Sequence, residues 1–362
     1  MPRTPENSTT RQIDDATGAA RAARARKTRT DRHAARAARK RRRHRIMAVV
    51  TLLAVAATAG YVYYRYDRIA DMLGPSMPGD REAVAEVADP VGGNNGPGAP
   101  LYVLILGSDA RPGETRALSD TIILARVDST NREITMLSLP RDSRVEIPGY
   151  GLDKITHANL YGGPALVMQT VKNLTGLPVN HYAELDFEGF VALVDAVGGV
   201  EITLEEALYD RHTGIAGGLP GVTYIPAGTQ RLNSAQALAF VRSRAYPDGD
   251  FTRVKNQQKF LVAFVRQVLR GENITRLPSI AEAMADNVET SMRIPEVLAL
   301  AQDFKDLSEQ NMRGYSVPAT TAMIGGVSYV ILEEPAASVL YREFGEGTVG
   351  ESAGSRQLLK EP

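Results

Sequence analysis

The stretch IMAVVTLLAVAATAGYVYY, Ile46 to Tyr64, holds no charged residue and constrains this chain more than any other feature. At about 1.5 Å rise per residue, a helix of that length crosses a hydrocarbon core of about 30 Å. The pattern predicts one transmembrane helix over residues 46–65. A buried helix and a cleaved signal peptide are the competing interpretations. We favour a retained anchor because the apolar run is longer than a typical signal core and continues past Ala57 and Ala59.

Charge is sorted along the chain on either side of that run. Residues 1–45 carry 15 Lys and Arg against 4 Asp and Glu, so the remaining 317 residues of this formally neutral chain carry 27 basic and 38 acidic residues. The cluster RKRRRHR, Arg39 to Arg45, abuts the apolar run, and such clusters stay on the cytoplasmic side. We therefore expect a single-pass protein of the cell membrane, with a cytoplasmic N-terminus and an extracytoplasmic domain.

The basic tail, residues 1–45, is poor in large apolar residues, so we expect it to be disordered. A DNA-binding arm is one interpretation of its charge. Attraction to anionic membrane lipids is the better one, because the basic cluster lies next to the predicted anchor, and we expect no nucleic-acid partner. The chain has no cysteine, so the exported part must build its own apolar core without disulfides.

The exported part divides by composition. Residues 66–98 end in DPVGGNNGPGAP, and this density of Gly, Pro and Asn predicts a spacer. A folded domain is predicted over residues 99–345. The end of the chain, residues 346–362, has the composition of a flexible tail.

Apolar periodicity predicts strands and helices in mixed order across residues 99–345. Predicted strands cover 101–107, 120–128, 133–140, 181–187 and 200–204, and predicted helices cover 163–175 and 187–199. A short helix starts at Asn233 or Ser234, and a long one is capped by Thr252 and ended by Gly271. The order indicates the α/β class, a single domain with a mixed central β-sheet flanked by helices.

The segment FVRSRAYPDGDFTRVKNQQ gathers several arginines. If the chain is extended after the short helix, Arg242 and Arg244 point to the same side. Arg253 and Gln257 share one face near the start of the long helix, where free N–H groups and the helix dipole attract anions. Guanidinium groups match phosphate oxygens, so the pattern predicts a site for a multiply charged anion. Pairing with the aspartates of the intervening loop is the competing interpretation.

Acidic and basic residues also follow the predicted strands. Asp109 and Arg111 come directly after the first strand, Asp120 opens the second, and Arg141 and Asp142 follow the third. These side chains meet if the strands are neighbours, at the edge where ligands collect in α/β sheets. Two carboxylates near a phosphate pocket suggest a Mg²⁺ ion held partly by protein and partly by phosphates. Taken alone, each aspartate is more often a turn or cap residue.

Together these segments resemble the LytR-CpsA-Psr (LCP) family, membrane-anchored enzymes of bacterial cell envelopes. The matching segments are LILGSDAR, SDTIILARVD, MLSLPRDSRVEIPGYGLDKITHANLYGG, FEGFVALVDAVGGVEI, GTQRLNSAQALAFVRSR and DFTRVKNQQKFL. They run in family order over roughly Pro100 to Gly271, with a weaker match to about Phe344. The resemblance implies an LCP-type domain behind one transmembrane helix.

The resemblance also implies a Mg²⁺-dependent phosphotransfer. Such proteins move a glycopolymer from a polyprenyl-pyrophosphate carrier to a hydroxyl of peptidoglycan, forming a phosphodiester. Carried over to this chain, the Mg²⁺-linked carboxylates are Asp109 and Asp120. The chemistry also needs a base for the acceptor hydroxyl, and the sequence does not decide between Asp109 and Asp120 for that role. The implied pyrophosphate ligands are Arg141, Lys154, Arg242, Arg244, Arg253 and Gln257. The implied catalytic group is Asp109, Asp120, Arg141, Arg242 and Arg244, with Arg111 and His157 as weaker candidates.

Two other function classes remain open at this point. A pyrophosphatase acting on the same lipid-linked glycan would use the same residues and release the glycan to water. A membrane-bound envelope regulator without catalysis is the other, although the basic tail shows no helix-turn-helix pattern and lies across the bilayer from the arginines. The sequence contains neither an HExxH zinc motif nor a P-loop. It leaves open which glycopolymer and which acceptor are used.

Overall fold

The computed structural model describes the chain in several stretches, all within the second of its two compact units, residues 66–362. The described residues are 77, 79–92, 96, 98–110, 114, 116–210, 224–246, 250–270, 273, 276, 280, 288–350 and 356–357. The predicted basic tail 1–45 and anchor 46–65 lie outside them, as does Arg111. Within the described stretches, no helix is both long and apolar enough to cross a membrane.

The described elements form one main sheet, four small sheets and a set of helices. The strands of the main sheet are β1 (Leu101–Ser108), β2 (Ser119–Asp128), β3 (Glu133–Ser138), β6 (His181–Leu185), β11 (Val288–Thr290), β12 (Met312–Ser316) and β15 (Arg356–Gln357). The small sheets pair β4 (Arg144–Ile147) with β5 (Gly151–Lys154), β7 (Val200–Leu204) with β10 (Gly228–Leu232), β8 (Leu208–Tyr209) with β9 (Tyr224–Ile225), and β13 (Ala319–Ile324) with β14 (Val327–Leu332). The helices are α2 (Asp80–Val87), α3 (His157–Thr175), α4 (Phe187–Ala196), α5 (Ser234–Arg242), α6 (Asp250–Val268), α9 (Ile294–Asp303) and α10 (Ala336–Glu346), with a 3₁₀ turn at Glu309–Asn311.

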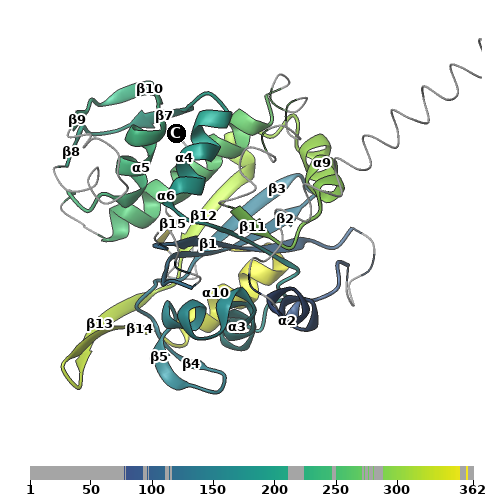
Figure 1. The fold of residues 1–362 in the computed structure, drawn as a ribbon, viewed down its shortest axis with the longest axis vertical. Helices are drawn as coiled ribbons and strands as arrows, with labels where there is room; N and C mark the ends of the chain where they lie inside the picture. Colours follow the sequence, from purple (N-terminus) through teal and green to yellow (C-terminus); the bar gives the residue numbers. More distant parts are fainter. Residues whose placement is uncertain are drawn as a thin grey trace, which may run out of the picture. The chain divides into compact units, whose positions relative to one another are not determined.

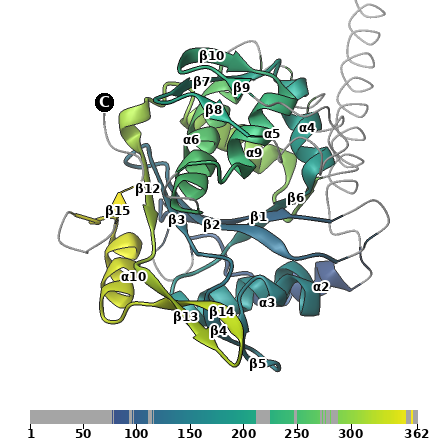
Figure 2. The same ribbon diagram turned by 90° about the vertical axis from the view of Figure 1, so that its left-hand side faces the viewer.

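The main sheet is mixed and lies between two helical layers. Its strand order is β11-β6-β1-β2-β3-β12-β15, with β1 parallel to β6, β3 parallel to β12, and β1, β2 and β3 antiparallel in sequence. Helices α2, α3 and α10 cover one face, and α4, α5, α6 and α9 lie over the other (Figure 1). The view in Figure 2 shows the same three layers. The predicted α/β class with a mixed central sheet is confirmed.

Alternation along the strands explains the layers. In β2, Ile122 and Leu124 belong to the apolar cluster shared with α3 and α10, whereas Ile123 and Ala125 belong to the cluster shared with α6 and α9. Successive strand residues point to opposite faces, so a run that is apolar at every position is buried on both sides. Each such Leu or Ile side chain contributes roughly 1.5–3 kcal/mol by leaving water.

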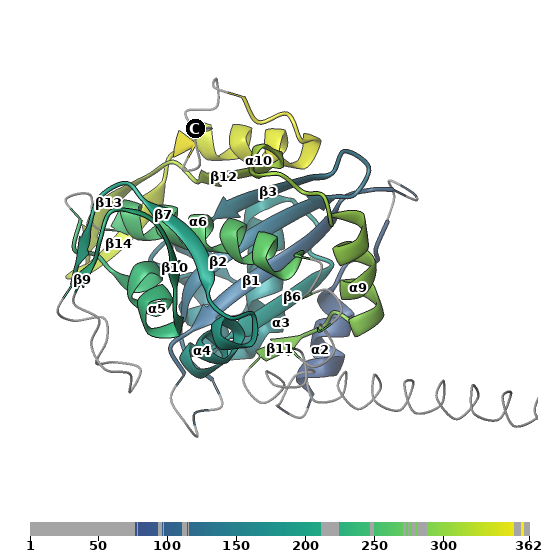
Figure 3. The same cartoon turned by 90° about the horizontal axis from the view of Figure 1, so that it is seen from above.

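A third apolar cluster lies among α4, α5, α6 and β7. It buries Phe190 and Val194 of α4 against Phe260 of α6, and the rings of Phe190 and Phe260 lie 4.8 Å apart. This packing fixes α4, α5 and α6 as one body above β1, β2 and β3 (Figure 3). Helices α5 and α6 therefore have defined positions over the sheet.

Helix boundaries differ from the predicted ones at three places. Helix α3 begins at His157 rather than residue 163, because the turn before Gly163 is already helical and the chain kinks at that glycine (φ 65°) before Pro164. Arg242 is the last residue of α5, so it is helical rather than extended, and the chain becomes extended at Ser243. Helix α6 begins at Asp250, so Thr252 lies inside the first turn and is not the cap.

The predicted spacer and tail each contain structure. Helix α2 lies within the predicted spacer 66–98, packs on α3 and buries Val84. In the predicted tail 346–362, the two residues of β15 pair with Tyr315 and Ser316 of β12. Both are short elements with weak patterns, which is why composition alone assigned them to irregular segments.

Candidate active site

The ends of three neighbouring strands bring the acidic residues together. The bulge between β1 and β2 sets Ser108 opposite Ser119, so Asp109 and Asp120 lie at the same edge of the sheet. Asp109 is fixed by two hydrogen bonds with Leu118: its N–H donates to the Leu118 carbonyl at 3.2 Å, and its Oδ1 accepts from the Leu118 N–H at 3.2 Å. The predicted convergence of Asp109 and Asp120 at one edge is therefore what the structure has.

A chain of ion pairs runs from Asp120 along this edge. The guanidinium of Arg141 donates to Asp120, and its Nε lies 3.4 Å from Oδ2 of Asp142. The ammonium of Lys154 donates to the other Asp142 oxygen at 2.8 Å. Although burial favours the neutral form of Asp142, the hydrogen bond from Lys154 and the charge of Arg141 hold its pKa below the usual value. The acid therefore stays ionised and fixes both cations.

The pKa of Asp109 is shifted in the opposite direction from that of Asp142. Burial raises its pKa, and the negative charge of Asp120 adds to that rise, against the opposing hydrogen bond from Leu118. Two carboxylates that repel each other through space favour a cation between them. No group of three or more His, Asp or Glu side chains with metal-ligand geometry occurs in the described stretches. If a Mg²⁺ ion binds at this edge, Asp109 and Asp120 are the described carboxylates that could hold it, and a bound phosphate and water would have to supply the remaining oxygens.

Helix α6 is held against the sheet and against α5 by consecutive amides. Asn256 donates to the Phe240 carbonyl at 3.3 Å and Gln257 to the Val241 carbonyl at 3.4 Å, both in the last turn of α5. Gln258, which is fully buried, donates to Ser138 Oγ at 2.7 Å and to the Tyr315 carbonyl at 3.0 Å. These bonds fix the face of α6 that carries the predicted anion ligands.

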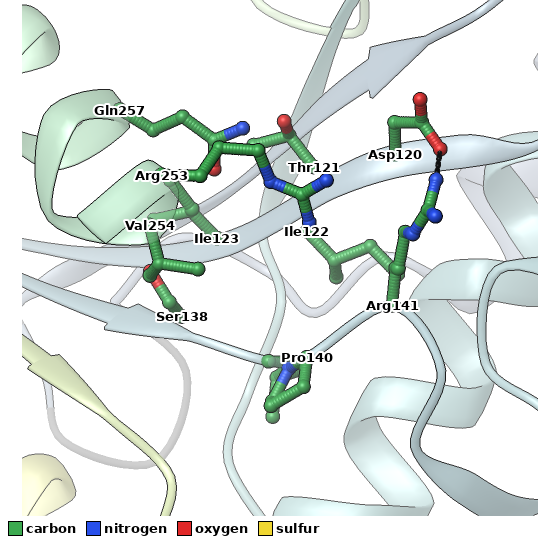
Figure 4. Close-up of a pocket in the computed structure, with 11 residues that line it drawn as sticks. Asp120, Thr121, Ile122, Ile123, Ser138, Pro140, Arg141, Arg253, Val254 and Gln257 are labelled. Carbon is green, nitrogen blue, oxygen red and sulfur yellow. Dashed lines mark hydrogen bonds and ion pairs between the residues drawn. The ribbon is translucent and has the colours of Figure 1, made fainter. Parts of the chain in front are cut away.

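That face and the strand ends line a small pocket that is open to solvent. Its lining comes from the start of β2, the end of β3 and the first turns of α6: Asp120, Thr121, Ile122, Ile123, Ser138, Leu139, Pro140, Arg141, Arg253, Val254 and Gln257. In Figure 4, the Arg253 guanidinium reaches from α6 over β2, while Arg141 rises from the end of β3 to Asp120. Two guanidinium groups, a carboxamide and a carboxylate therefore face one cavity, a composition suited to a phosphate ester.

Arg242 stands beside this pocket at the end of α5. Its guanidinium carbon lies 4.1 Å from the centre of the ring of Phe187, and Phe187 is the first residue of α4. Burial lowers the pKa of Arg242, and the charges of Asp120 and Asp109 oppose that shift. The Nη1 atom of Arg242 is buried and has no hydrogen-bond partner among the described residues. A buried cationic donor without an acceptor is ready to take an anionic oxygen.

The turn after α5 is anchored by a buried serine. Ser243 is fully buried, and its Oγ donates to Oδ2 of Asp210 at 2.6 Å and accepts from the Ala245 N–H at 3.1 Å. Because Ser243 stands between Arg242 and Arg244, this bond sets the path of the chain between the two arginines. The sequence alone does not reveal this pair, because nothing in the pattern around Asp210 links it to a residue so much later in the chain.

Comparison with known proteins identifies the family. The model of the LytR_cpsA_psr family matches residues 63–344 of this chain. The chain belongs to the LytR-CpsA-Psr family. The predicted resemblance is thereby confirmed, over a longer stretch than the motifs alone had indicated.

Relatives within the LCP family have names that state an activity. The polyisoprenyl-teichoic acid–peptidoglycan teichoic acid transferase TagU of Enterococcus faecalis is 33% identical over 65% of this chain and 75% of its own length. The crystal structure of Bacillus subtilis TagV matches with a TM-score of 0.60 at 27% identity, covering 69% of this chain and 97% of that one. A structure of TagT bound to LI-WTA matches with a TM-score of 0.56 at 27% identity, covering 68% and 90%.

Some of the site residues predicted from the sequence lie at the pocket, and others do not. Arg141, Arg253, Gln257 and Asp120 line the pocket, and Asp109 and Arg242 adjoin it. Three other candidates are not part of the pocket lining. Lys154 reaches Asp142 rather than the pocket lining, Arg244 is exposed, and the Nδ1 atom of His157 lies 2.8 Å from Asp153. The roles of all these residues in binding or catalysis stay predictions.

Proposed function

We propose that this chain transfers a glycopolymer from a polyprenyl-pyrophosphate carrier to a hydroxyl group of peptidoglycan. The observation that carries the proposal is the convergence of Asp120, Arg141 and Arg253 on one pocket in a chain of the LCP family. The Enterococcus faecalis relative acts, by its name, on teichoic acid and peptidoglycan. The glycopolymer of this chain need not be a teichoic acid.

The arginines bind the pyrophosphate and stabilise the charge that grows on it. Arg141 and Arg253 approach from the sheet and from α6, and Arg242 adds a buried donor beside them. Phosphoryl transfer places negative charge on the non-bridging oxygens in the transition state, where fixed cations act most strongly. When phosphate oxygens enter, they compete with Asp120 for the Arg141 guanidinium.

The reaction exchanges one P–O bond for another. The acceptor hydroxyl oxygen forms a bond to the phosphorus that carries the glycan, and the bond from that phosphorus to the bridging oxygen breaks. Polyprenyl monophosphate leaves with the bonding electron pair, and the hydroxyl proton passes to a base. We assign the base to Asp109, because it lies at the same end of the strands as Asp120 and, unlike Asp120, has no hydrogen bond with Arg141 among the described residues.

A divalent cation fits the two carboxylates in part. Asp109 and Asp120 would hold Mg²⁺ together with the pyrophosphate, and the ion would neutralise phosphate charge and help to ionise the acceptor hydroxyl. The mutual repulsion that helps to raise the Asp109 pKa is the feature of the structure that favours such an ion. Membrane lipids would be contacted through residues 46–65 and the basic tail 1–45, with the described domain outside the cytoplasm.

The test uses the full-length chain with a synthetic polyprenyl-pyrophosphate oligosaccharide, Mg²⁺ and a peptidoglycan fragment, with products identified by mass spectrometry. We expect a phosphodiester conjugate, and a loss of roughly a hundredfold or more in kcat/KM for Arg242→Ala. Arg244→Ala tests whether the exposed arginine also contributes. Arg270→Ala is the matched control, because its side chain is exposed and lies 3.7 Å from Glu201 in a weak surface pair.

Free glycan phosphate in place of a conjugate would favour the pyrophosphatase. No turnover with any acceptor, together with unchanged donor binding in Arg242→Ala, would contradict the site as well as the reaction.

A further inference from the structure

Exposed aromatic and apolar side chains gather on the β4–β5 hairpin and the start of α3. Tyr150 and Leu152 are 56% and 54% exposed, and the Tyr150 ring stacks on that of Tyr161 with centroids 4.5 Å apart and planes 13° from parallel. Surface rings of a soluble domain are normally scattered, and a group of them marks a contact site. We call Tyr150, Asp153, His157 and Tyr161 the tyrosine platform.

Hydrogen bonds hold the platform in one arrangement. The Tyr161 hydroxyl donates to Oδ2 of Asp153 at 2.7 Å, and the Nδ1 atom of His157 lies 2.8 Å from the same oxygen. The Tyr150 hydroxyl donates to the Tyr161 carbonyl at 3.3 Å. Burial alone would raise the pKa of Asp153. The hydrogen bonds from His157 and Tyr161 outweigh that effect and keep the pKa below its usual value, so the carboxylate is charged. The platform thus pairs a fixed ring with an ionised acceptor at its edge.

The platform is continuous with the pocket. Asp153 is followed by Lys154, which pairs with Asp142, and Asp142 lies against Arg141 of the pocket. The β13–β14 hairpin supports this connection: the Tyr329 ring lies 5.7 Å from the Lys154 ammonium. Figures 1 and 2 both show β4 and β5 beside β13 and β14, on the α3 side of the sheet.

We propose that the tyrosine platform binds a sugar ring of the peptidoglycan acceptor, and this rests on the proposed function. An exposed aromatic face packs against the C–H face of a pyranose, and a carboxylate beside it accepts hydrogen bonds from sugar hydroxyls. The position of the platform favours the acceptor, because it adjoins the pocket through Lys154, Asp142 and Arg141 without being part of its lining. The ionised Asp153 carboxylate at the edge of the rings disfavours a phosphate group and accepts hydrogen bonds from sugar hydroxyls.

The test measures binding of chitotetraose, a neutral β-1,4-linked N-acetylglucosamine oligomer, to the full-length chain in detergent, by calorimetry or saturation-transfer NMR. We expect Tyr150→Ala to weaken binding roughly tenfold, the size of effect expected when one packed ring is lost. Tyr150→Phe keeps the ring and should bind within about twofold of the wild type. The matched control is Tyr224→Ala, which removes an equally exposed tyrosine, 56%, from β9.

A second measurement separates this inference from the function itself. In the transfer assay, Tyr150→Ala should raise the KM for the peptidoglycan fragment and leave the KM for the lipid-linked donor unchanged. Transfer that is insensitive to Tyr150→Ala overturns the platform and leaves the proposed function standing. Chitotetraose binding that is lost in Tyr150→Ala supports the platform even if no transfer is found. A wild type that fails to bind chitotetraose, or a Tyr150→Ala variant that loses liposome binding instead, overturns the proposal.

Discussion

Ser243→Ala tests how the arginine-bearing turn is held in place. The Ser243 hydroxyl is fully buried and donates to the Asp210 carboxylate at 2.6 Å, and hydrogen bonds to charged groups contribute about 1.5–3 kcal/mol. Its removal also takes the acceptor from the Ala245 N–H, 3.1 Å away. We therefore expect the free energy of unfolding to fall by roughly 2–3 kcal/mol. Arg242 and Arg244 flank this serine, so the donor KM should rise while kcat changes less.

Ser143→Ala provides the matched control. Ser143 is equally buried, and among the described residues its hydroxyl has no hydrogen-bond partner, so its loss should change stability by less than about 0.5 kcal/mol. Urea unfolding followed by far-UV circular dichroism measures both variants, since the chain has no tryptophan to report by fluorescence. Equal stability of the two alanine variants, or a Ser243→Ala variant with an unchanged donor KM, would refute the reasoning.

Three further changes test other parts of the structure. Burial raises the pKa of Glu184 from 4.5 to about 7, so between these pH values the folded state keeps a proton that the unfolded state has lost. The free energy of unfolding should therefore fall as the pH rises from 4.5 to 7. Glu184→Gln should remove roughly 1–3 kcal/mol of that fall, measured by unfolding the variant and the wild type at both pH values. Gly163→Ala adds a methyl group 2.4 Å from the Arg116 guanidinium, at a residue whose φ is 65°. It should lower the melting temperature more than Gly176→Ala does, because Gly176 has a similar φ but no atom within 4 Å of the added methyl group. Gln258→Met leaves a buried hydroxyl and a carbonyl without their amide donor, so chemical unfolding should show a loss of about 1–3 kcal/mol.

The part of the site on the sheet follows from patterns that single sequences carry well. Apolar runs stopped by Gly and Pro predicted β1, β2 and β3, and in the structure the second and third of these pair as antiparallel neighbours. Adjacent strands then put Asp109, Asp120 and Arg141 at one edge. That inference needs only sequence order and strand direction, which is why it holds.

Long-range contacts could not be predicted in the same way. The bond from Ser243 to Asp210 joins segments whose separation no periodicity records, and the helical state of Arg242 follows from packing on α4 and α6 rather than from a stop signal. One missed element did carry a signal. The β13–β14 hairpin turns at Gly325 and Gly326, both with positive φ, and a Gly-Gly pair between apolar runs is typical of such turns.

The central claim is that an acceptor hydroxyl, rather than water, attacks the glycan phosphate. The most direct measurement runs the reaction of the full-length chain in ¹⁸O-water with the lipid-linked donor, Mg²⁺ and a peptidoglycan fragment, and reads the isotope content of every phosphate product by mass spectrometry. We predict a phosphodiester conjugate without ¹⁸O, formed by the wild type and lost in Arg242→Ala. Glycan phosphate carrying one ¹⁸O atom, with no conjugate, would contradict the account.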